Sequence, residues 1–430
     1  MNVYLGIDLG STTSKAVVVD ASGQIIGRGI TNTRSDYAVA ARIAQMEAEF
    51  NSRFTLLKRA VKKNSAREYD WDGLFAALDD RFHCLQFELR FDELVDAMRK
   101  NESTIADAGL RGRISEVLPG VAAEVKATVH QRFINGEVSS TTQFFRDLFN
   151  GAYMRVLERS HPELFDEMVA LYDRSINPIE NREMAFSFHD LMLKALTLWP
   201  DKYKGRAAEV EACFKEIEAF DMTASDYVGT GYGRQLLPFE QKHIKSEILC
   251  HAMGAHACFP ETRTVLDIGG QDTKAIQVDQ YGLVTSFQMN DRCAAGCGRY
   301  LGYIADEMNI NVGELGPLAL KATHAANICS TCTVFAGAEL REHLNLGERK
   351  ENILAGLHKA IVQRAFGLLA RSGGVRNEFT ITGGVARNPA VRKYVAEMVQ
   401  QNYGNVSINT DPDSIFMGAL GAALFAARRK

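Results

Sequence analysis

The sequence predicts an α/β fold in which two β-rich parts of the chain are separated by a long helical insertion, and three observations lead to this prediction. Residues 3–30 form apolar segments broken by a Gly-Ser-Thr-Thr turn and by Ala-Ser-Gly, a pattern typical of a β-meander. Residues 39–220 change to helical periodicity, with prolines expected at helix ends or connections: Pro119, Pro162, Pro178 and Pro200. Strand and glycine patterns return at residues 226–234 and 264–270, so the helical stretch is expected to be an insertion.

The bulk composition is that of a globular protein with two or three domains. The chain has 430 residues, a formal net charge of -4 and a hydrophobic share of 46%. This mildly acidic balance argues against a nucleic-acid or anionic-membrane partner. The first residues lack a basic segment followed by an apolar core, and no apolar run reaches the ~18 residues of a membrane helix. We therefore expect a cytoplasmic protein whose eight cysteines are reduced.

The segment of residues 5–15 has the pattern of a phosphate-binding hairpin. An apolar strand carries Asp8, turns sharply on glycine, and presents hydroxyl groups before the next strand. Glycine lets the backbone approach an anion, successive N–H groups can bind its oxygens, and Asp8 can hold the water shell of a magnesium ion. The candidate phosphate-binding residues of this hairpin are Gly10, Ser11, Thr12, Thr13 and Lys15.

The same pattern returns in residues 265–275, where Asp267 is the strand acid. The candidate phosphate-binding residues here are Gly269, Gly270, Gln271 and Thr273. A third glycine turn, in residues 380–388, follows an apolar strand and precedes a helix, so Gly383 and Gly384 can lie against a nucleoside. One such turn alone is most often only a hairpin, but three in this order favour a nucleotide site.

This order of motifs resembles the phosphate 1, phosphate 2 and adenosine motifs of the actin-like ATPase superfamily. The resemblance implies duplicated ribonuclease H-like lobes with ATP and Mg²⁺ between them. It also implies a polar residue that orients the attacking water, for which Glu247 in the predicted helix of residues 246–252 is the candidate; the alternative is a solvated helix carboxylate. The expected domains are residues 1–38 with 221–260 as the first lobe, 39–220 as the insertion, and 261–430 as the second lobe.

Four of the cysteines form a late pair of pairs: Cys293, Cys297, Cys329 and Cys332. Cys293 precedes one predicted amphipathic helix and Cys332 opens another. The positive end of a helix stabilises a thiolate, so both positions favour metal ligation over inert burial. Two alternatives stay open, namely buried structural thiols, and a zinc ion or cluster held by all four cysteines within one chain.

Four strings, at residues 229–234, 267–274, 290–296 and 330–336, closely resemble the activator family of 2-hydroxyacyl-CoA dehydratases and the ATP-binding subunits of benzoyl-CoA reductase. The resemblance covers residues 1–35 and about 220–430. In that family one cysteine at each of two positions ligates a 4Fe-4S cluster, and a second homologous subunit supplies the other ligands; Cys293 and Cys332 occupy these positions. Cys297, where the family often has threonine, and Cys329 depart from the pattern.

The resemblance implies an ATP-hydrolysing subunit that passes low-potential electrons from a ferredoxin-like donor, through a subunit-bridging cluster, to acyl-CoA-binding reductase subunits. The long insertion resembles the larger ATP-binding subunit of benzoyl-CoA reductase, so this enzyme of anaerobic aromatic degradation is the expected partner. The alternatives are activation of a 2-hydroxyacyl-CoA dehydratase, a small-molecule kinase of the same superfold, and an actin-like filament. The helical insertion is expected either to form a docking surface for other subunits or to be an addition that takes no part in catalysis.

Overall fold

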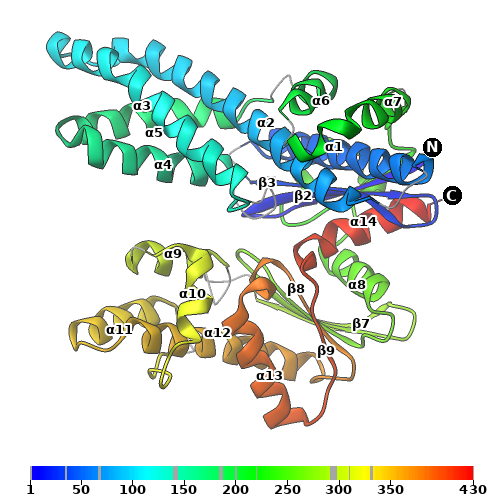
Figure 1. Cartoon of the computed structure of the whole chain (residues 1–430). Coiled ribbons are helices and arrows are strands. Elements are labelled where there is room, and N and C mark those ends of the chain that lie inside the picture. Colours follow the sequence, from blue (N-terminus) through cyan, green and yellow to red (C-terminus); the bar gives the residue numbers. More distant parts are fainter. Residues whose placement is uncertain are drawn as a thin grey trace. The chain divides into compact units, whose positions relative to one another are not determined.

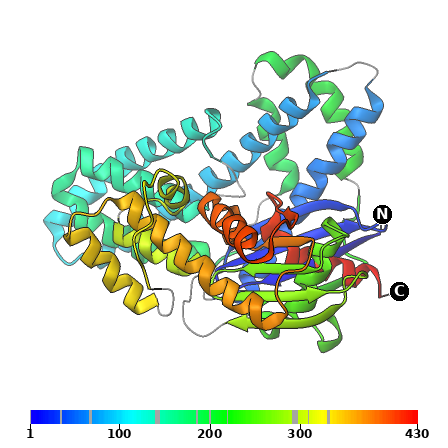
Figure 2. The same cartoon turned by 90° about the horizontal axis from the view of Figure 1, so that it is seen from below.

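The computed structural model describes residues 2–33, 36–65, 69–138, 144–183, 187–198, 201–218, 220–290, 298–308, 310–329 and 333–429. It divides into two compact units, drawn in Figures 1 and 2. The helical unit spans Gly29–Met222, and the sheet unit combines Asn2–Arg28 with Thr223–Lys430. The predicted insertion of residues 39–220 therefore lies inside the helical unit.

The first sheet of the sheet unit has the strand order β3-β2-β1-β4. Its strands are β1 (Val3–Leu9), β2 (Thr13–Asp20), β3 (Ile25–Asn32) and β4 (Asp226–Thr230). β1 runs antiparallel to β2 and parallel to β4. Every residue of β1 is buried, as expected for an apolar strand covered on both faces.

The last helix, α14 (Met417–Ala427), packs against this first sheet and against α8 (Glu247–Cys258), which itself contacts the second sheet. The two helices lie side by side in Figure 1 although they are far apart in the sequence. Glycine permits the close approach, because a Cβ at Gly421 would overlap the carbonyl oxygen of Cys250, and one at Gly6 would overlap that of Ala419. The last helix was expected in the second lobe, of residues 261–430, but the main contacts of α14 are with α8, β1 and β4.

The second sheet repeats the topology of the first, with the order β7-β6-β5-β8-β9. Its strands are β5 (Thr264–Ile268), β6 (Thr273–Val278), β7 (Val284–Asn290), β8 (Phe379–Thr382) and β9 (Ile408–Asn409). β5 is antiparallel to β6 and parallel to β8, as β1 is to β2 and β4. This repeat confirms the prediction of two lobes of like topology.

Five helices share one apolar core with the second sheet. They are α9 (Gly298–Met308), α10 (Val312–Ala319), α11 (Thr333–Asn345), α12 (Lys350–Ser372) and α13 (Pro389–Tyr403). Among the described residues, α12 is the one helix long and apolar enough to cross a membrane, and 72% of its apolar window is buried in the protein. Its burial in this core accounts for that composition.

The helical unit contains α1 (Tyr37–Asn64), α2 (Trp71–Asn101), α3 (Ala108–Ile134), α4 (Phe145–Ser160), α5 (Phe165–Glu180), α6 (Phe188–Thr197) and α7 (Ala207–Glu218). One apolar core joins α2 to α3, α4 and α5, and a second joins α1, α2, α6 and α7. The helix α2, which is 31 residues long, contributes residues to both cores. A helix of this length spans about 45 Å, which explains how one element serves two cores.

Two of the four prolines were wrongly predicted to end helices. Pro119 lies inside α3 and Pro178 inside α5. In α3 a buried stripe of apolar residues at helical spacing continues on both sides of the proline, so tertiary packing outweighs the local penalty. Pro162 begins a short 3-10 helix as expected, and Pro200 lies outside the described residues.

Short 3-10 helices complete the described fold. They span Glu102–Thr104, Pro162–Leu164, Asp201–Arg206, Arg234–Leu236, Gln241–His243, Gly384–Arg387 and Ser414–Phe416. The segment at Gly384–Arg387 belongs to the third predicted glycine turn, which begins directly after β8.

Candidate functional site

Each of the two sheets holds one buried aspartate beside one lysine. Asp8 on β1 faces Lys15 on β2, and the ammonium Nζ lies 3.3 Å from the carboxylate Oδ2. The corresponding pair of the second sheet is Asp267 and Lys274, 3.2 Å apart. The two aspartates are 3% and 1% exposed. A tight turn between antiparallel strands places residues seven apart opposite each other, so the repeated hairpin produces the same pair twice.

Lys274 contacts three carboxylates, of which Asp267 and Glu247 are buried and Asp272 is partly buried. Besides Asp267, its Nζ lies 2.8 Å from Oδ1 of Asp272 and 3.9 Å from Oε1 of Glu247. Burial alone would lower the pKa of Lys274, but the three carboxylates outweigh it and raise the pKa above its usual range. Lys274 is not among the site residues predicted from the sequence, although the spacing of Asp267 and Lys274 repeats that of Asp8 and Lys15.

Asp267 has two further neighbours, one on β8 and one on α8. Thr382 donates a hydrogen bond of 2.9 Å to Oδ1. His251 places Nδ1 3.2 Å from the same oxygen, without forming a hydrogen bond of good geometry. Burial would raise the pKa of Asp267, but the charges of His251 and Lys274 outweigh it and hold the pKa well below its usual range. The carboxylate is therefore ionised.

His251 also connects the two aspartates in space. A Cβ at Gly418 would lie 2.9 Å from its Nε2 and 3.0 Å from Oδ2 of Asp8. His251 on α8 therefore has Asp267 of β5 beside its Nδ1, while its Nε2 and the carboxylate of Asp8 on β1 both lie next to Gly418 of α14. His251 is not among the residues predicted from the sequence, although it follows Glu247 by one helical turn and so shares its helix face.

Glu247 is the first residue of α8 and is 7% exposed. Burial raises the pKa of its carboxyl group, and the nearby Lys274 opposes this effect only in part. The alternative of a solvated helix carboxylate is therefore wrong. The side chain belongs to the same cluster of charges as Asp267, because both carboxylates contact Lys274.

The predicted glycine turns lie next to these carboxylates. Gly10, Ser11 and Thr12 form the turn between β1 and β2, and Thr13 begins β2. Gly269, Gly270 and Gln271 lie in the turn before β6, which Thr273 begins. The two turns are in contact, since a Cβ at Gly270 would overlap the hydroxyl of Thr12.

The third turn approaches the second aspartate. Gly383 has a φ of 87°, which favours glycine, and a Cβ there would lie 2.9 Å from Oδ1 of Asp267. Gly384 directly follows it as the first residue of the Gly384–Arg387 segment. All three predicted turns are therefore grouped around the two aspartates within the sheet unit.

The comparison with protein families agrees with this arrangement. The model of the BadF/BadG/BcrA/BcrD ATPase family matches residues 5–426. The chain belongs to this family of ATPases.

Three relatives with stated activities match about half of this ATPase and most of their own length. The (R)-2-hydroxyglutaryl-CoA dehydratase activating ATPase of Acidaminococcus fermentans is 44% identical over 202 residues, 47% of this chain and 75% of that protein. The activator of lactoyl-CoA dehydratase of Anaerotignum propionicum is 41% identical over 227 residues, 53% of this chain and 83% of that protein. One of the subunits of the benzoyl-CoA reductase of Thauera aromatica is 35% identical over 215 residues, 50% of this chain and 76% of that protein.

Two solved structures share the fold. Component A of the Acidaminococcus fermentans (R)-2-hydroxyglutaryl-CoA dehydratase matches with a TM-score of 0.52 at 24% identity, covering 100% of this chain and 99% of that one. The activator of the 2-hydroxyisocaproyl-CoA dehydratase from Clostridium difficile with bound ADPNP matches with a TM-score of 0.51 at 23% identity, covering 99% and 94%. Together with the repeated sheets, they confirm the predicted α/β, actin-like ATPase fold class.

Of the four late cysteines, Cys293, Cys297 and Cys332 lie outside the described residues. The helices expected after them are present, with α9 beginning at Gly298 and α11 at Thr333. Cys329 is described and partly buried, and its backbone N–H donates to Oε2 of Glu339 over 2.5 Å. Cluster ligation by Cys293 and Cys332 stays a prediction.

The backbone connects the start of α9 to the second glycine turn. The N–H of Gly298 donates to the carbonyl of Gly269, and that of Arg299 donates to the carbonyl of Gly270, each over 2.9 Å. The first turn of a helix leaves N–H groups without partners inside the helix, and here two of them bind this turn. The second glycine turn and the start of α9 are therefore joined by two direct hydrogen bonds.

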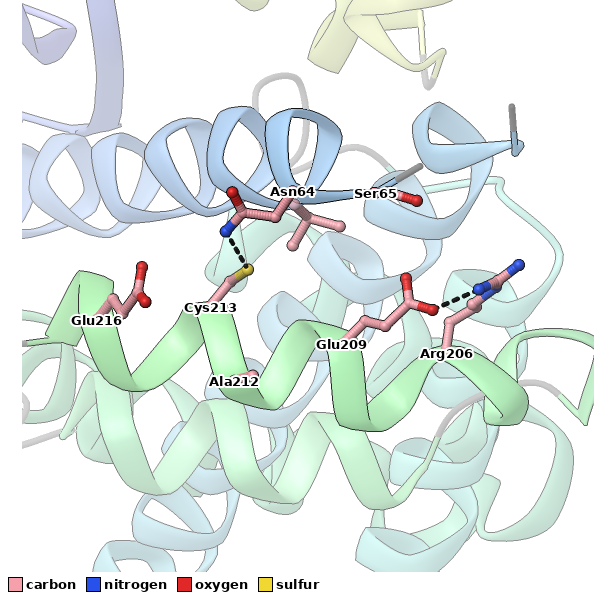
Figure 3. A pocket seen from close by; sticks show the side chains of 8 residues that line it. Asn64, Ser65, Arg206, Glu209, Ala212, Cys213 and Glu216 are labelled. Carbon is pink, nitrogen blue, oxygen red and sulfur yellow. Dashed lines mark hydrogen bonds and ion pairs between the residues drawn. The ribbon is translucent and has the colours of Figure 1, made fainter. Parts of the chain in front are cut away.

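The ATPase also has an open pocket of about 550 Å³ within its helical unit. Figure 3 shows its wall between α1 and α7, where Arg206 is paired with Glu209, and Asn64 donates to Sγ of Cys213 over 3.6 Å. The remaining lining residues are Val61, Ser65, Ala212 and Glu216. Among the described residues, none of those predicted to bind the nucleotide lines this pocket.

Proposed function

We propose that this ATPase is an electron activator, which uses ATP hydrolysis to drive electron transfer into a partner enzyme that acts on an acyl-CoA. Its relatives support this proposal, because they include activators of two acyl-CoA dehydratases and a subunit of an acyl-CoA reductase. The observation that carries it is the pair of hydrogen bonds from α9 to the turn at Gly269 and Gly270. These bonds connect the candidate phosphate turn to the helix that follows Cys293 and Cys297.

The described residues fit a magnesium nucleotide. Two buried carboxylates of separate hairpins are the oxygen ligands that Mg²⁺ prefers, and the adjoining turns leave no room for a Cβ at Gly270 or Gly383. We assign Mg²⁺ to Asp8 and Asp267, and the nucleoside to Gly383 and Gly384. We assign the phosphates to Gly10, Ser11, Thr12, Thr13, Lys15, Gly269, Gly270, Gln271 and Thr273.

Glu247 is the proposed general base for the attacking water. Its buried carboxyl group has a raised pKa, which makes it a better proton acceptor than a surface carboxylate. Lys274 holds this side chain and Asp267 in one cluster and balances their charges. ATP, when bound, supplies the phosphoanhydride that the water cleaves.

The electron-carrying part of the proposal is a 4Fe-4S cluster shared with a second homologous subunit. Cys293 and Cys332 are the proposed ligands of this chain, each close before a helix that begins at Gly298 or Thr333. A cluster at such helix starts is stabilised by their positive ends, and it supplies one-electron chemistry. A ferredoxin-like protein is the proposed donor, and the proposed location is the cytoplasm.

For the partner, the identities favour a 2-hydroxyacyl-CoA dehydratase. The two dehydratase activators are 44% and 41% identical to this chain, against 35% for the relative from benzoyl-CoA reductase. Benzoyl-CoA reductase, which the long insertion favoured in the sequence analysis, is the second candidate. Purified dehydratase and reductase components, each supplied with this ATPase, ATP and a reductant, would distinguish the two partners by which one becomes active.

The first test is iron and acid-labile sulfide in anaerobically purified protein. We expect iron in the parent, its loss in Cys293→Ser and Cys332→Ser, and no change in Cys258→Ser, which alters an exposed cysteine at the end of α8. ATP hydrolysis should be lost in Asp267→Asn while the iron stays. A parent protein that hydrolyses ATP but binds no iron, even with its partner, would refute electron activation and favour the kinase.

The coupling itself is tested at the first residue of α9. Gly298→Pro removes the N–H that binds Gly269, whereas Gly298→Ala keeps it and places its Cβ at ordinary contact distances of 3.5 to 3.6 Å. We expect both variants to bind iron and hydrolyse ATP. The electron paramagnetic resonance spectrum of the reduced cluster should change when ATP is added to the parent and to Gly298→Ala, but not when it is added to Gly298→Pro. An ATP response of Gly298→Pro equal to that of the parent would contradict the coupling between the turn and α9.

A further inference from the structure

Three side chains capable of binding a metal converge between α2 and α3 of the helical unit. Cys84 and Glu88 are one turn apart on α2, and His130 reaches them from α3. Sγ of Cys84 lies 3.5 Å from Oε1 of Glu88 and 3.6 Å from Nδ1 of His130, and these last two atoms are 2.7 Å apart. We propose that Cys84, Glu88 and His130 bind a zinc ion that clamps α2 to α3.

The distances between the three atoms suit a tetrahedral ion. Zinc bonds are about 2.3 Å to sulfur and about 2.0–2.1 Å to nitrogen or oxygen, which puts a sulfur ligand about 3.5–3.6 Å from either of the others. The two separations that involve Sγ of Cys84 already have these values. The third pair, Glu88 and His130, must open from 2.7 Å to about 3.3 Å, which a small change of the glutamate rotamer provides.

The set of donors favours zinc over the other common ions. Thiolate, imidazole and carboxylate together are a typical combination for zinc, whereas magnesium and calcium take oxygen ligands alone. The Cys84 residue is 2% exposed, while the side chain of His130 is 37% exposed. The ion can therefore enter beside His130, and a water molecule can complete the fourth position.

Metal binding replaces a set of hydrogen bonds. Without the ion, the carboxylate of Glu88 accepts from the thiol of Cys84 and from Nδ1–H of His130. Burial and the adjacent Glu88 raise the pKa of Cys84 to about 12, so the metal-free thiol keeps its proton and zinc binding releases it. Arg81, whose Nη1 lies 3.4 Å from Nε2 of His130, must turn away, because that nitrogen then carries the imidazole proton.

The position of the site gives the ion a structural role. Cys84 belongs to the apolar core that joins α2 to α3, α4 and α5. Residues of α2 before it, such as Phe82, belong to the other core of the helical unit. An ion bound here would fix α3 to the segment of α2 where the two cores meet. This role is independent of nucleotide and of the proposed cluster.

Cobalt titration of the full-length protein tests the proposal, because Co²⁺ substitutes for zinc and absorbs in the near ultraviolet when bound by thiolate. The background is Cys293→Ser/Cys332→Ser, which removes the cysteines proposed for the cluster. We expect the background protein to bind one equivalent of Co²⁺ with a thiolate band that zinc abolishes. Adding Cys84→Ser should remove this equivalent and its band, and adding Glu88→Gln or His130→Gln should weaken it about tenfold or more.

The matched control is Cys213→Ser on α7. Cys213 is a buried thiol of the same unit, with glutamates at helical spacing, but its partner is the amide of Asn64. This variant should bind cobalt like the background protein. Circular dichroism checks that the variants are folded, and Glu88→Gln preserves the side-chain size. The proposal is overturned if the background protein has no thiolate band, or if folded Cys84→Ser and Glu88→Gln bind the same cobalt as Cys213→Ser.

Discussion

Replacing Lys274 by methionine should destabilise the second sheet strongly. Lys274→Met removes an ammonium that contacts Asp267, Asp272 and Glu247, at 3.2, 2.8 and 3.9 Å. The side chains of Lys274, Asp267 and Asp272 are at most 13% exposed, so the carboxylates would lose this ammonium while they are largely without water. Of the three carboxylates, Asp267 would keep a second basic neighbour among the described residues, His251 at 3.2 Å. Breaking a buried pair in this way costs about 3–5 kcal/mol. A methionine fills a similar volume, which limits any packing loss.

Hydrogen exchange of peptides from β5 and β6 measures this effect. Both tryptophans, Trp71 and Trp199, lie in the helical unit's residue range, so fluorescence serves as a reference that should not change. With Mg²⁺ removed, a loss of about 3–5 kcal/mol should accelerate exchange of the strand peptides by about two to four orders of magnitude. The control Lys393→Met, which breaks a half-exposed pair with Glu397 on α13, should change exchange by less than about fivefold.

The stability of Lys274→Met relative to the parent should depend on pH. Without Lys274, the pKa of Glu247, already raised by burial, rises further. A carboxyl group whose pKa is higher in the folded state takes up a proton on folding, so the variant gains stability as the pH falls toward the usual pKa of glutamate. The difference between the variant and the parent should therefore be larger at pH 8 than at pH 5.5. A loss of less than tenfold in protection at pH 8 would refute the reasoning.

Two further predictions concern stability and pH. Gly421→Ala should lower the free energy of unfolding in urea by about 1–3 kcal/mol, because the new Cβ would overlap the carbonyl oxygen of Cys250. The control Gly367→Ala, whose Cβ would have nothing within 4 Å, should raise the free energy of unfolding by about 0.5–1 kcal/mol. Equal effects of the two variants would contradict the close packing of α8 and α14. Burial lowers the pKa of His358 to about 4, and its Nε2 accepts a hydrogen bond from Asn388. Because the unfolded chain takes up the proton at higher pH than the folded protein does, the free energy of unfolding should fall by up to about 3 kcal/mol between pH 6.5 and pH 4. Urea unfolding followed by circular dichroism at pH 7 and pH 4.5 should show a smaller loss of stability on acidification in His358→Gln than in the parent.

Much of the candidate site was predictable because its motifs are local. The strand, acid, glycine and strand of each hairpin lie within about a dozen residues, and the two aspartates were named from that pattern alone. Lys274 was also predictable, since the spacing from Asp267 repeats that between Asp8 and Lys15. His251 was not, because its position beside Asp267 depends on how α8 packs against the second sheet.

The sequence by itself determined the elements and the chemistry they carry: two hairpins with one acid each, three glycine turns, and a long helical stretch between them. These features follow from interactions between residues near each other in the chain, such as the steric freedom of glycine and the periodicity of apolar side chains. Only the tertiary structure decided that His251 lies beside Asp267 and shares the neighbourhood of Gly418 with Asp8. It also decided that α3 continues through Pro119, and that Cys84 and Glu88 face His130. Each depends on the burial of apolar faces from distant segments, which selects one packing that no local pattern specifies.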